Sequence, residues 1–196
     1  ICKLMKATEE LNKHRRAKKM MLWFGIASLG MSFAGLTSAY VVSKERADWL
    51  ENLQIPQAFW ISLGVILVSS VTMYLAKRSV LQESHKKATL WLWVTFLLGV
   101  LFIFLQYKGF SEIYNEFGYS FTGPTSTISY SYIFLIVMVH ILHVIAALIS
   151  LIVVIYNHYK QKYHQGNTLG IELAATFWHF VDFLWIYLFL FFYFVR

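Results

Sequence analysis

The sequence contains little cysteine, proline or charge. Among its 196 residues there is one cysteine, Cys2, and there are two prolines, Pro56 and Pro124. A single cysteine excludes an internal disulfide and a cysteine-based metal cluster, and we expect Cys2 to be an inert thiol. Only 14% of the residues are charged, against about 25% in soluble domains. This composition excludes an ordinary water-soluble domain.

Long apolar runs take up most of the chain. Hydrophobic residues make up 58% of it and aromatic residues 18%, and about 20 apolar residues suffice for a helix to cross a bilayer. We predict an all-α, polytopic membrane protein, a five-helix transmembrane domain over residues 20–196 that follows a basic segment at residues 1–19. The predicted spans are about 20–42, 57–76, 88–107, 130–156 and 172–195.

Basic residues are concentrated on one side of the predicted membrane. Of the seventeen Lys and Arg residues, thirteen lie before the first span or in the connections after the second and fourth spans, and four lie on the opposite side. By the positive-inside rule, the N-terminus is then cytoplasmic and the C-terminus is outside. The same distribution explains the net charge of +7, so we expect no nucleic-acid partner.

The first span is rich in small residues. Ser28 and Ser32, and likewise Gly35 and Ala39, are separated by three residues. Such pairs allow helix backbones to approach closely in lipid. We therefore expect this helix to pack against other helices on more than one side.

The fifth span places ionisable side chains in an apolar setting. It contains Glu172, His179 and Asp182, with Trp178 and Trp185 beside them. An ionisable group in hydrocarbon is costly unless it faces a partner or water. On a helix, Glu172 and His179 share one stripe, while Trp178, Asp182 and Trp185 share the next. We predict a polar seam that faces protein.

Two histidines of the fourth span, His140 and His143, lie three residues apart and share a face of the helix. They could hold zinc or copper with His179 as a third ligand, or one of them could pair with His179 on a haem. The neighbouring side chains are bulky and no motif points to a particular metal. We therefore favour hydrogen bonds between helices and assign neither a metal ligand nor a catalytic residue.

A proton relay is a further alternative. Glu172 and Asp182, together with the histidines, could pass protons as titratable chains do in transporters. Glu172 also lies at the start of its helix, where a carboxylate complements the helix dipole. The fourth and fifth spans lack proline and interior glycine, whereas transporter sites are typically built on broken helices. This argues against transport.

Two motifs resemble subunit III of the haem-copper oxidases, and three shorter segments follow in the family's order. The motifs are Trp178-His179-Phe180-Val181-Asp182, with Glu172 upstream, and His140-x-x-His143-Val144. The shorter segments are Phe33-Ala34-Gly35 through Tyr40, Ile55-Pro56, and Leu98-Gly99-Val100 leading to Leu105-Gln106. The resemblance covers nearly all of the chain after the basic segment.

The resemblance implies a five-helix bacterial form of this family in the inner membrane. Such a subunit carries no cofactor of its own and packs against the catalytic subunit I, in a complex with subunit II and small subunits. It holds structural phospholipid and supports proton uptake during oxygen reduction, while haem and copper belong to its partners. Neither the electron donor, cytochrome c or quinol, nor membership of a larger supercomplex follows from this chain.

The chain departs from the family pattern at two places, one of which bears on lipid. No acidic residue occurs between Met20 and Val42, where seven-helix members often carry a glutamate. At the end of the fourth span, Asn157 stands where family members often have an arginine near lipid headgroups. We therefore expect lipid contacts from four other residues: His158, Lys160, Trp178 and Trp185.

Our main hypothesis is a non-catalytic oxidase subunit with an interhelical polar network that fixes the bundle. The predicted members of this network are Glu172, His179, Asp182, His140 and His143. Two rivals stay open at this point. One is a membrane cytochrome that binds haem through His179 and His140 or His143, and the other is a proton or ion transporter.

Overall fold

Five long α-helices make up the regular structure of the described part of the chain. The computed structural model describes residues 2–46, 49, 56–82, 84–115, 128–161 and 168–195, without the side chains of residues 2–8 and 11. These residues contain no strand, and the helices are α1 (Cys2–Ser43), α2 (Gln57–Leu81), α3 (His85–Asn115), α4 (Ile128–Tyr159) and α5 (Leu169–Phe194). All five are long and apolar enough to cross a membrane. The predicted fold class, a polytopic helical membrane protein, is confirmed.

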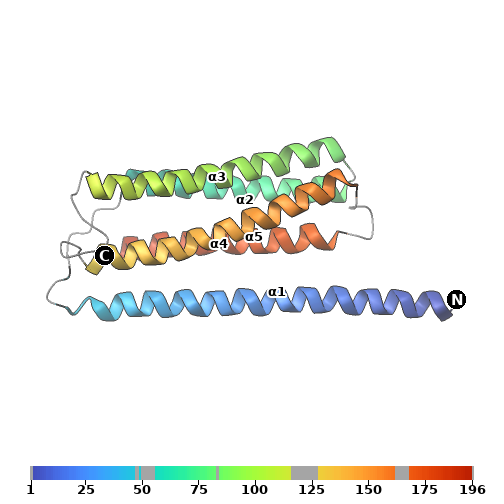
Figure 1. Ribbon diagram of the computed structural model, residues 1–196, viewed down its shortest axis with the longest axis horizontal. Coiled ribbons are helices and arrows are strands. Elements are labelled where there is room, and N and C mark those ends of the chain that lie inside the picture. The colour runs from blue at the N-terminus through green and yellow to red at the C-terminus, as the bar shows by residue number, and fades with distance from the viewer. Residues whose placement is uncertain are drawn as a thin grey trace.

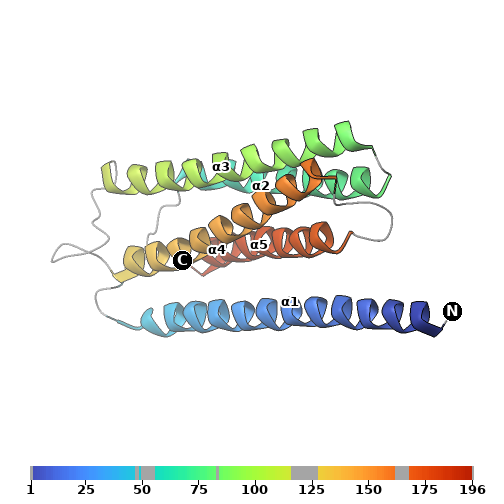
Figure 2. The same cartoon turned by 45° about the vertical axis from the view of Figure 1, so that its right-hand side comes forward.

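Helices α2 to α5 form a ring, and α1 lies outside it (Figures 1 and 2). In the ring, α2 packs on α3, α3 on α4, α4 on α5, and α5 back on α2. Among the described residues, α1 contacts α4 and α5 but neither α2 nor α3. Successive helices run in opposite directions, so α1, α3 and α5 are parallel (Figure 1). The first helix is therefore peripheral to the bundle.

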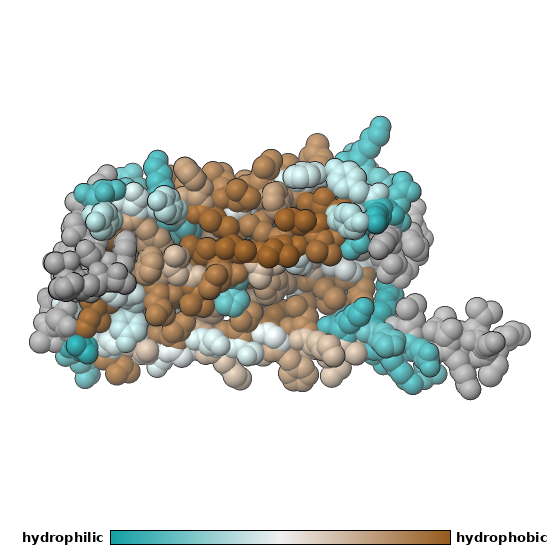
Figure 3. All heavy atoms as spheres, in the orientation of Figure 1, coloured by the Kyte–Doolittle hydropathy of each residue, from teal (hydrophilic) through white to brown (hydrophobic). Residues whose placement is uncertain are grey.

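Hydrophilic and hydrophobic residues separate along the helix axes. Apolar residues dominate the middle of the face shown in Figure 3, and hydrophilic residues gather at both ends. We call the end that holds the N-terminus and the α2–α3 and α4–α5 connections the basic end, after Lys19, Lys77, Lys86 and Lys160, and the opposite end the far end. An apolar middle between two polar ends is the pattern of a bilayer-spanning bundle. Which end faces the cytoplasm stays a prediction.

Most helices extend beyond the spans predicted from hydropathy. Helix α1 is continuous from Cys2, so the predicted basic segment at residues 1–19 and the first span are parts of one helix. The segment 108–129, with its glycines, Pro124 and polar residues, predicts an irregular loop, but α3 continues to Asn115 and includes Gly109. A Cβ on Gly109 would lie 2.5 Å from Phe59 Cε1, so glycine serves here for close packing of α3 on α2. The remainder of the predicted loop, residues 116–127, lies outside the described residues.

Proline marks the start of the second span, as predicted. Pro56 directly precedes α2, which begins at Gln57, and the Phe59 N–H donates to the Pro56 carbonyl at 3.1 Å. A proline at this place loses no helical hydrogen bond, because the first N–H groups of a helix have no partner within it. This boundary is confirmed.

Candidate functional site

A set of polar side chains lies buried inside the apolar bundle. Their exposed fractions are below one tenth, and most belong to the ring α2–α5. The members within the ring helices are Ser62, Ser69, Thr72, Ser79, Thr95, Gln106, Ser129, His140, His158 and Asp182. A polar group in hydrocarbon must find its partner within the protein, so these contacts define the candidate site.

Helices α2 and α3 are joined by two pairs of polar side chains. Thr72 Oγ1 and Thr95 Oγ1 are hydrogen-bonded at 2.9 Å, and Gln106 Nε2 donates to Ser62 Oγ at 2.9 Å. Ser62 Oγ in turn donates to the Phe59 carbonyl. Thr72 Oγ1 and Thr95 Oγ1 lie 2.9 and 2.8 Å from a carbonyl of their own helix, so one hydroxyl donates to the other threonine and the second donates to its own helix. Hydroxyl contacts of this kind are typical of helix pairs in membranes. They set the register of α2 against α3.

Helices α2 and α5 are joined by two adjacent serines. Trp178 Nε1 donates to Ser69 Oγ at 3.0 Å. Ser70 Oγ lies 2.7 Å from His179 Nδ1, and the same hydroxyl lies beside the Asp182 carboxylate, whose Oδ2 has no hydrogen-bond partner among the described residues. One serine thus adjoins both the histidine and the aspartate of the fifth span. We call His179, Ser70 and Asp182 the Ser70 triplet.

His140 lies in an aromatic enclosure at the centre of the bundle. Its ring is fully buried and stacks on Trp185, with centroids 5.3 Å apart and an interplanar angle of 23°. Phe102 of α3 and Phe33 of α1 contact it edge-on at 6.0 and 6.3 Å. Among the described residues neither imidazole nitrogen has a hydrogen-bond partner. The side chain thus packs as an aromatic core residue that joins α4 to three other helices.

The other two candidate residues form local or peripheral contacts. His143 Nδ1 lies 2.6 Å from the carbonyl of Val139, one turn earlier in the same helix. Glu172 accepts a hydrogen bond from Thr168 Oγ1 at 2.8 Å and forms an ion pair with Lys19 Nζ at 2.7 Å. The second contact attaches α1 to α5 at the basic end.

The five predicted network residues therefore do not form one network. No hydrogen bond in the described part of the chain joins any two of Glu172, His179, Asp182, His140 and His143. Glu172 and Asp182 are ten residues apart, which is about 15 Å along a helix, so the two acids lie at different depths. Periodicity predicted the shared stripes on α5 but not the neighbouring helices that meet each stripe.

Sequence reasoning missed the serines and threonines of α2. Ser62 and Ser69 are seven residues apart, as are Thr72 and Ser79, and all four are buried. Hydroxyls at this spacing in an apolar span lie on one helix face. This regular spacing is the signal that could have predicted the contacts of α2 with α3 and α5.

Three of the four predicted lipid-contact residues are buried, and one is exposed. Trp178 and Trp185 are buried inside the bundle, and His158 is buried against α3, where its Nε2 lies 3.3 Å from the carbonyl of His85. Lys160 is exposed at the basic end, with its ammonium 4.7 Å from the ring centroid of Tyr156. Of the four side chains, Lys160 alone is on the surface.

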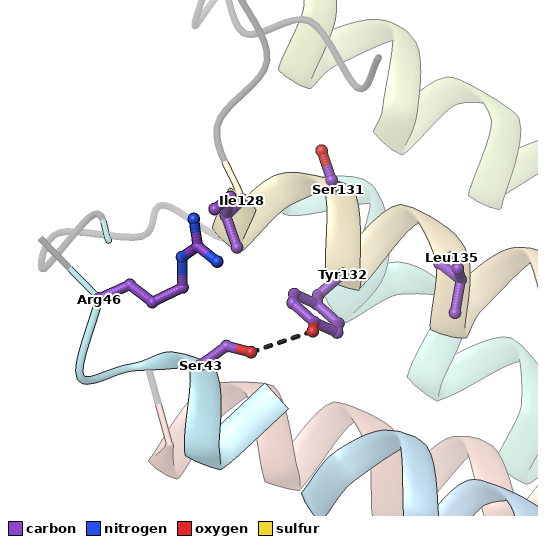
Figure 4. A pocket seen from close by; sticks show the side chains of 6 residues that line it. All are labelled: Ser43, Arg46, Ile128, Ser131, Tyr132 and Leu135. Atoms are coloured by element: carbon purple, nitrogen blue, oxygen red, sulfur yellow. Dashed lines mark hydrogen bonds between the residues drawn. The ribbon is translucent and has the colours of Figure 1, made fainter. Parts of the chain in front are cut away.

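Two recesses lie near the far end of the bundle. One, of about 400 Å³, lies between α1 and α4 (Figure 4) and is lined by Ser43, Arg46, Ile128, Ser131, Tyr132 and Leu135. Ser43 Oγ donates to Tyr132 Oη at 3.0 Å, and the Arg46 side chain extends toward Ile128. The other, of about 640 Å³, lies between α3 and α4, and its lining includes Ile103, Tyr107, Met138 and Ile141. Both combine apolar walls with hydroxyl groups.

The described residues contain no group of three His, Cys, Asp or Glu side chains placed to hold a metal ion. The histidines considered as joint ligands have separate surroundings. His179 is bonded to Ser70 of α2, His140 is enclosed by aromatic rings, and His143 is bonded to its own helix. This arrangement of contacts suits the attachment of one helix to another.

Comparison with known proteins gives a consistent set of relatives. The family model for cytochrome c oxidase subunit III matches residues 48–196. The chain is 28% identical to cytochrome bo(3) ubiquinol oxidase subunit 3 of Buchnera aphidicola, over 96% of this chain and 97% of the relative. It is also 28% identical to cytochrome c oxidase subunit 3 of Bacillus sp. strain PS3, over 93% of this chain and 89% of the relative.

A longer relative is matched only in part. The chain is 29% identical to cytochrome c oxidase subunit 3 of Drosophila melanogaster over 66% of its own length, and the match spans about half (47%) of that relative. The family match covers more than half of this chain and includes helices α2 to α5. The chain belongs to the cytochrome c oxidase subunit III family of the haem-copper oxidases.

Proposed function

We propose that this chain is a non-catalytic subunit of a respiratory terminal oxidase, in which it stabilises the catalytic subunit. The observation that carries the proposal is the nature of the buried polar groups. The Ser70 triplet and the two polar pairs between α2 and α3 hold helices together. Haem, copper, electron transfer and oxygen reduction then belong to the partner subunits, with subunit I as the main contact. Support of proton uptake by subunit I is part of the same proposal.

A bacterial inner membrane is the location that we propose, with the basic end in the cytoplasm. Helices α2 to α5 account for most of the matched region, and relatives from bacteria are matched over nearly their whole length. The basic residues at one end support this orientation through the positive-inside rule. Access of a membrane-impermeant thiol reagent to Ser43→Cys, at the far end, and Gln82→Cys, at the basic end, would test it in intact cells. Labelling of Gln82→Cys alone would contradict it.

The test of the proposed function is to purify the chain in mild detergent through a tag. We expect haem-bearing subunits to co-purify, and a reduced-minus-oxidised spectrum should show their bands. Removing this chain from the complex should leave those bands with the partners and leave initial turnover nearly unchanged, while turnover decays sooner. A haem band in the isolated chain would instead support a membrane cytochrome. A colourless chain without partners would favour a transporter.

We also propose that the recess between α1 and α4 holds a phospholipid. Arg46 and the hydroxyls of Ser43, Ser131 and Tyr132 suit a phosphate group, and Leu135 suits an acyl chain. In the purified complex, Arg46→Gln should lower the phospholipid phosphorus retained per haem. Lys44→Gln, a nearby change outside the lining, is the control. Equal retention in both variants would contradict a lipid site here.

A further inference from the structure

The outer surface of α2 and α5 carries a histidine side chain at a depth where lipid provides no hydrogen-bond partner. His179 is half-buried and lies ten residues into α5, about 15 Å from its start. Ser70 is likewise half-buried and lies near the middle of α2. Both therefore lie at the depth of the hydrocarbon. Lipid tails provide no hydrogen-bond partner at this depth, and a partly exposed imidazole there is costly.

Within the described residues, only one nitrogen of the His179 ring has a hydrogen-bond partner. Nδ1 is bonded to Ser70, and in the described part of the chain Nε2 has no hydrogen bond. Asp182, the third member of the Ser70 triplet, is buried beside Ser70. The triplet thus holds the imidazole in one orientation and leaves Nε2 for a group from another molecule.

Large apolar side chains surround this polar position. Trp60, Leu67 and Tyr74 follow one another at intervals of seven on α2, and their exposed fractions are 51, 50 and 58%. Phe183, one turn after His179 on α5, is 67% exposed. We call these four residues with His179 the α2–α5 face. An apolar surface with one oriented polar group at mid-depth has the composition of a helix interface in a membrane.

Helix α1 lies beside the α2–α5 face, next to α5. Thr37 Oγ1 and Tyr187 Oη, 3.1 Å apart, join α1 to α5, while Phe33 contacts α4 through His143. Gly30 lies two turns before Thr37 on the same face of α1. Ala27 and Ala34 are its neighbours on that face, one turn away in each direction. A Cβ on Gly30 would meet no atom within 4 Å. Small side chains along this edge of α1 would allow another helix to approach closely.

The opposite surface differs. The face of α3 and α4 exposes Leu97, Phe104, Leu142 and Ile149 in its middle, and apolar residues dominate it in Figure 3. Lipid suffices to cover such side chains. The contrast is between these two surfaces; His143 of α4 is likewise half-buried, but its Nδ1 is bonded to its own helix and its ring packs against Phe33 of α1.

We propose that the α2–α5 face binds a transmembrane helix of a partner subunit, which presents a polar side chain to His179 Nε2. This rests on the proposed function, because the partner is taken to be a haem-bearing subunit of the same complex. His179 is a positioning residue for this contact. Trp60, Leu67, Tyr74 and Phe183 pack around it and exclude lipid.

Cross-linking in the intact complex tests this directly. In a Cys2→Ser background, Leu67→Cys and Phe183→Cys would carry a photoreactive thiol reagent on the α2–α5 face, and Leu97→Cys and Leu142→Cys would carry it on the opposite face. All four side chains are at least half exposed, so these changes leave the core intact. We expect adducts with a haem-bearing subunit from the first pair only, identified by mass spectrometry of the cross-linked peptides.

A second measurement addresses His179 itself. His179→Phe should lower retention of this chain in the purified complex by about threefold, because a hydrogen bond between helices in a membrane protein contributes about 0.6 kcal/mol on average. The matched control is His143→Phe, a half-buried histidine whose Nδ1 contact is with its own helix. Its retention should stay near that of the unchanged chain.

The outcomes separate the inference from the proposed function. If haem-bearing subunits co-purify but the adducts arise from Leu97→Cys and Leu142→Cys, the inference is overturned and the function stands. Adducts of the first pair with lipid alone, or with a second copy of this chain, also overturn it. If no haem-bearing subunit co-purifies with the unchanged chain, both fail.

Discussion

Helix α1 and the ring α2–α5 are both built of apolar helices, yet they are attached in different ways. In the ring, helices approach closely and share buried hydroxyl contacts, as between Thr72 and Thr95. A Cβ on Gly99 of α3 would lie 2.7 Å from Trp178 of α5, which shows how little space the ring leaves. Among the five helices α1 is the least buried.

Among the described residues, polar contacts at three different depths attach α1. Lys19 pairs with Glu172 at the basic end, Thr37 with Tyr187 further along, and Ser43 with Tyr132 at the far end. Aromatic contacts of Phe33 and Tyr40 lie between them. In lipid no hydrophobic effect drives helices together, so packing and hydrogen bonds decide the attachment. The ring relies mainly on packing, whereas α1 is attached at spaced points and keeps one side open.

The largest effect is expected from overpacking the ring. Gly99→Leu would place a side chain where Trp178 and Leu148 already lie, and it should lower stability by about 3 kcal/mol. Gly35→Leu on α1 is the control, because a Cβ there meets no atom within 4 Å. Thermal unfolding in detergent would compare the two. Equal losses would remove the distinction between ring and α1.

A smaller effect is expected from a hydroxyl contact inside the ring. Thr72→Val removes one partner of the bond to Thr95 and should cost about 0.6 kcal/mol, the average for such bonds in a membrane protein. Thr72→Val combined with Thr95→Val should cost no more than the single change, since neither hydroxyl is then left without its partner. Unfolding midpoints of the single and double variants provide the measurement. Additive losses would show that the two hydroxyls act independently.

The smallest effect is expected at the attachment of α1. Glu172→Gln removes the ion pair between Glu172 and Lys19, whose side chains are 27 and 51% exposed, so the loss should be about 0.2 kcal/mol, the lower end for exposed pairs. Hydrogen exchange of α1 around Lys19 should rise at low salt, and the difference should shrink as salt screens the pair. Glu9→Gln, in the exposed pair Glu9–Lys13, is the control. A change that spreads through the ring would contradict separate attachment.

Much of the fold could be predicted from the sequence, because a span of apolar residues long enough for a bilayer has few other structures available. Pro56 marked the start of α2, because a proline there costs no helical hydrogen bond, which depends only on the local sequence. The end of α3 was predicted too early, at Tyr107, because hydropathy falls before the helix stops at Asn115. The polar seam on α5 was predicted to face protein, and its His179 and Asp182 do meet Ser70.

The partners of the polar residues could not be predicted in this way. Periodicity assigns residues to a stripe of one helix, but the helix opposite that stripe depends on how all five pack. Glu172 meets Lys19 from a distant part of the sequence, and His140 meets Trp185 by stacking rather than by a hydrogen bond. These contacts follow from the ring and from the place of α1 beside it.

By itself, the sequence determined the number of spans, the concentration of basic residues at one end and the family. Each depends on composition or on local motifs that survive without knowledge of the packing. Only the tertiary structure decided that Ser70 meets His179 beside Asp182, and that Trp178 and Trp185 lie inside the bundle. The physical reason is that these contacts depend on the rotation and depth of neighbouring helices, which close packing sets collectively.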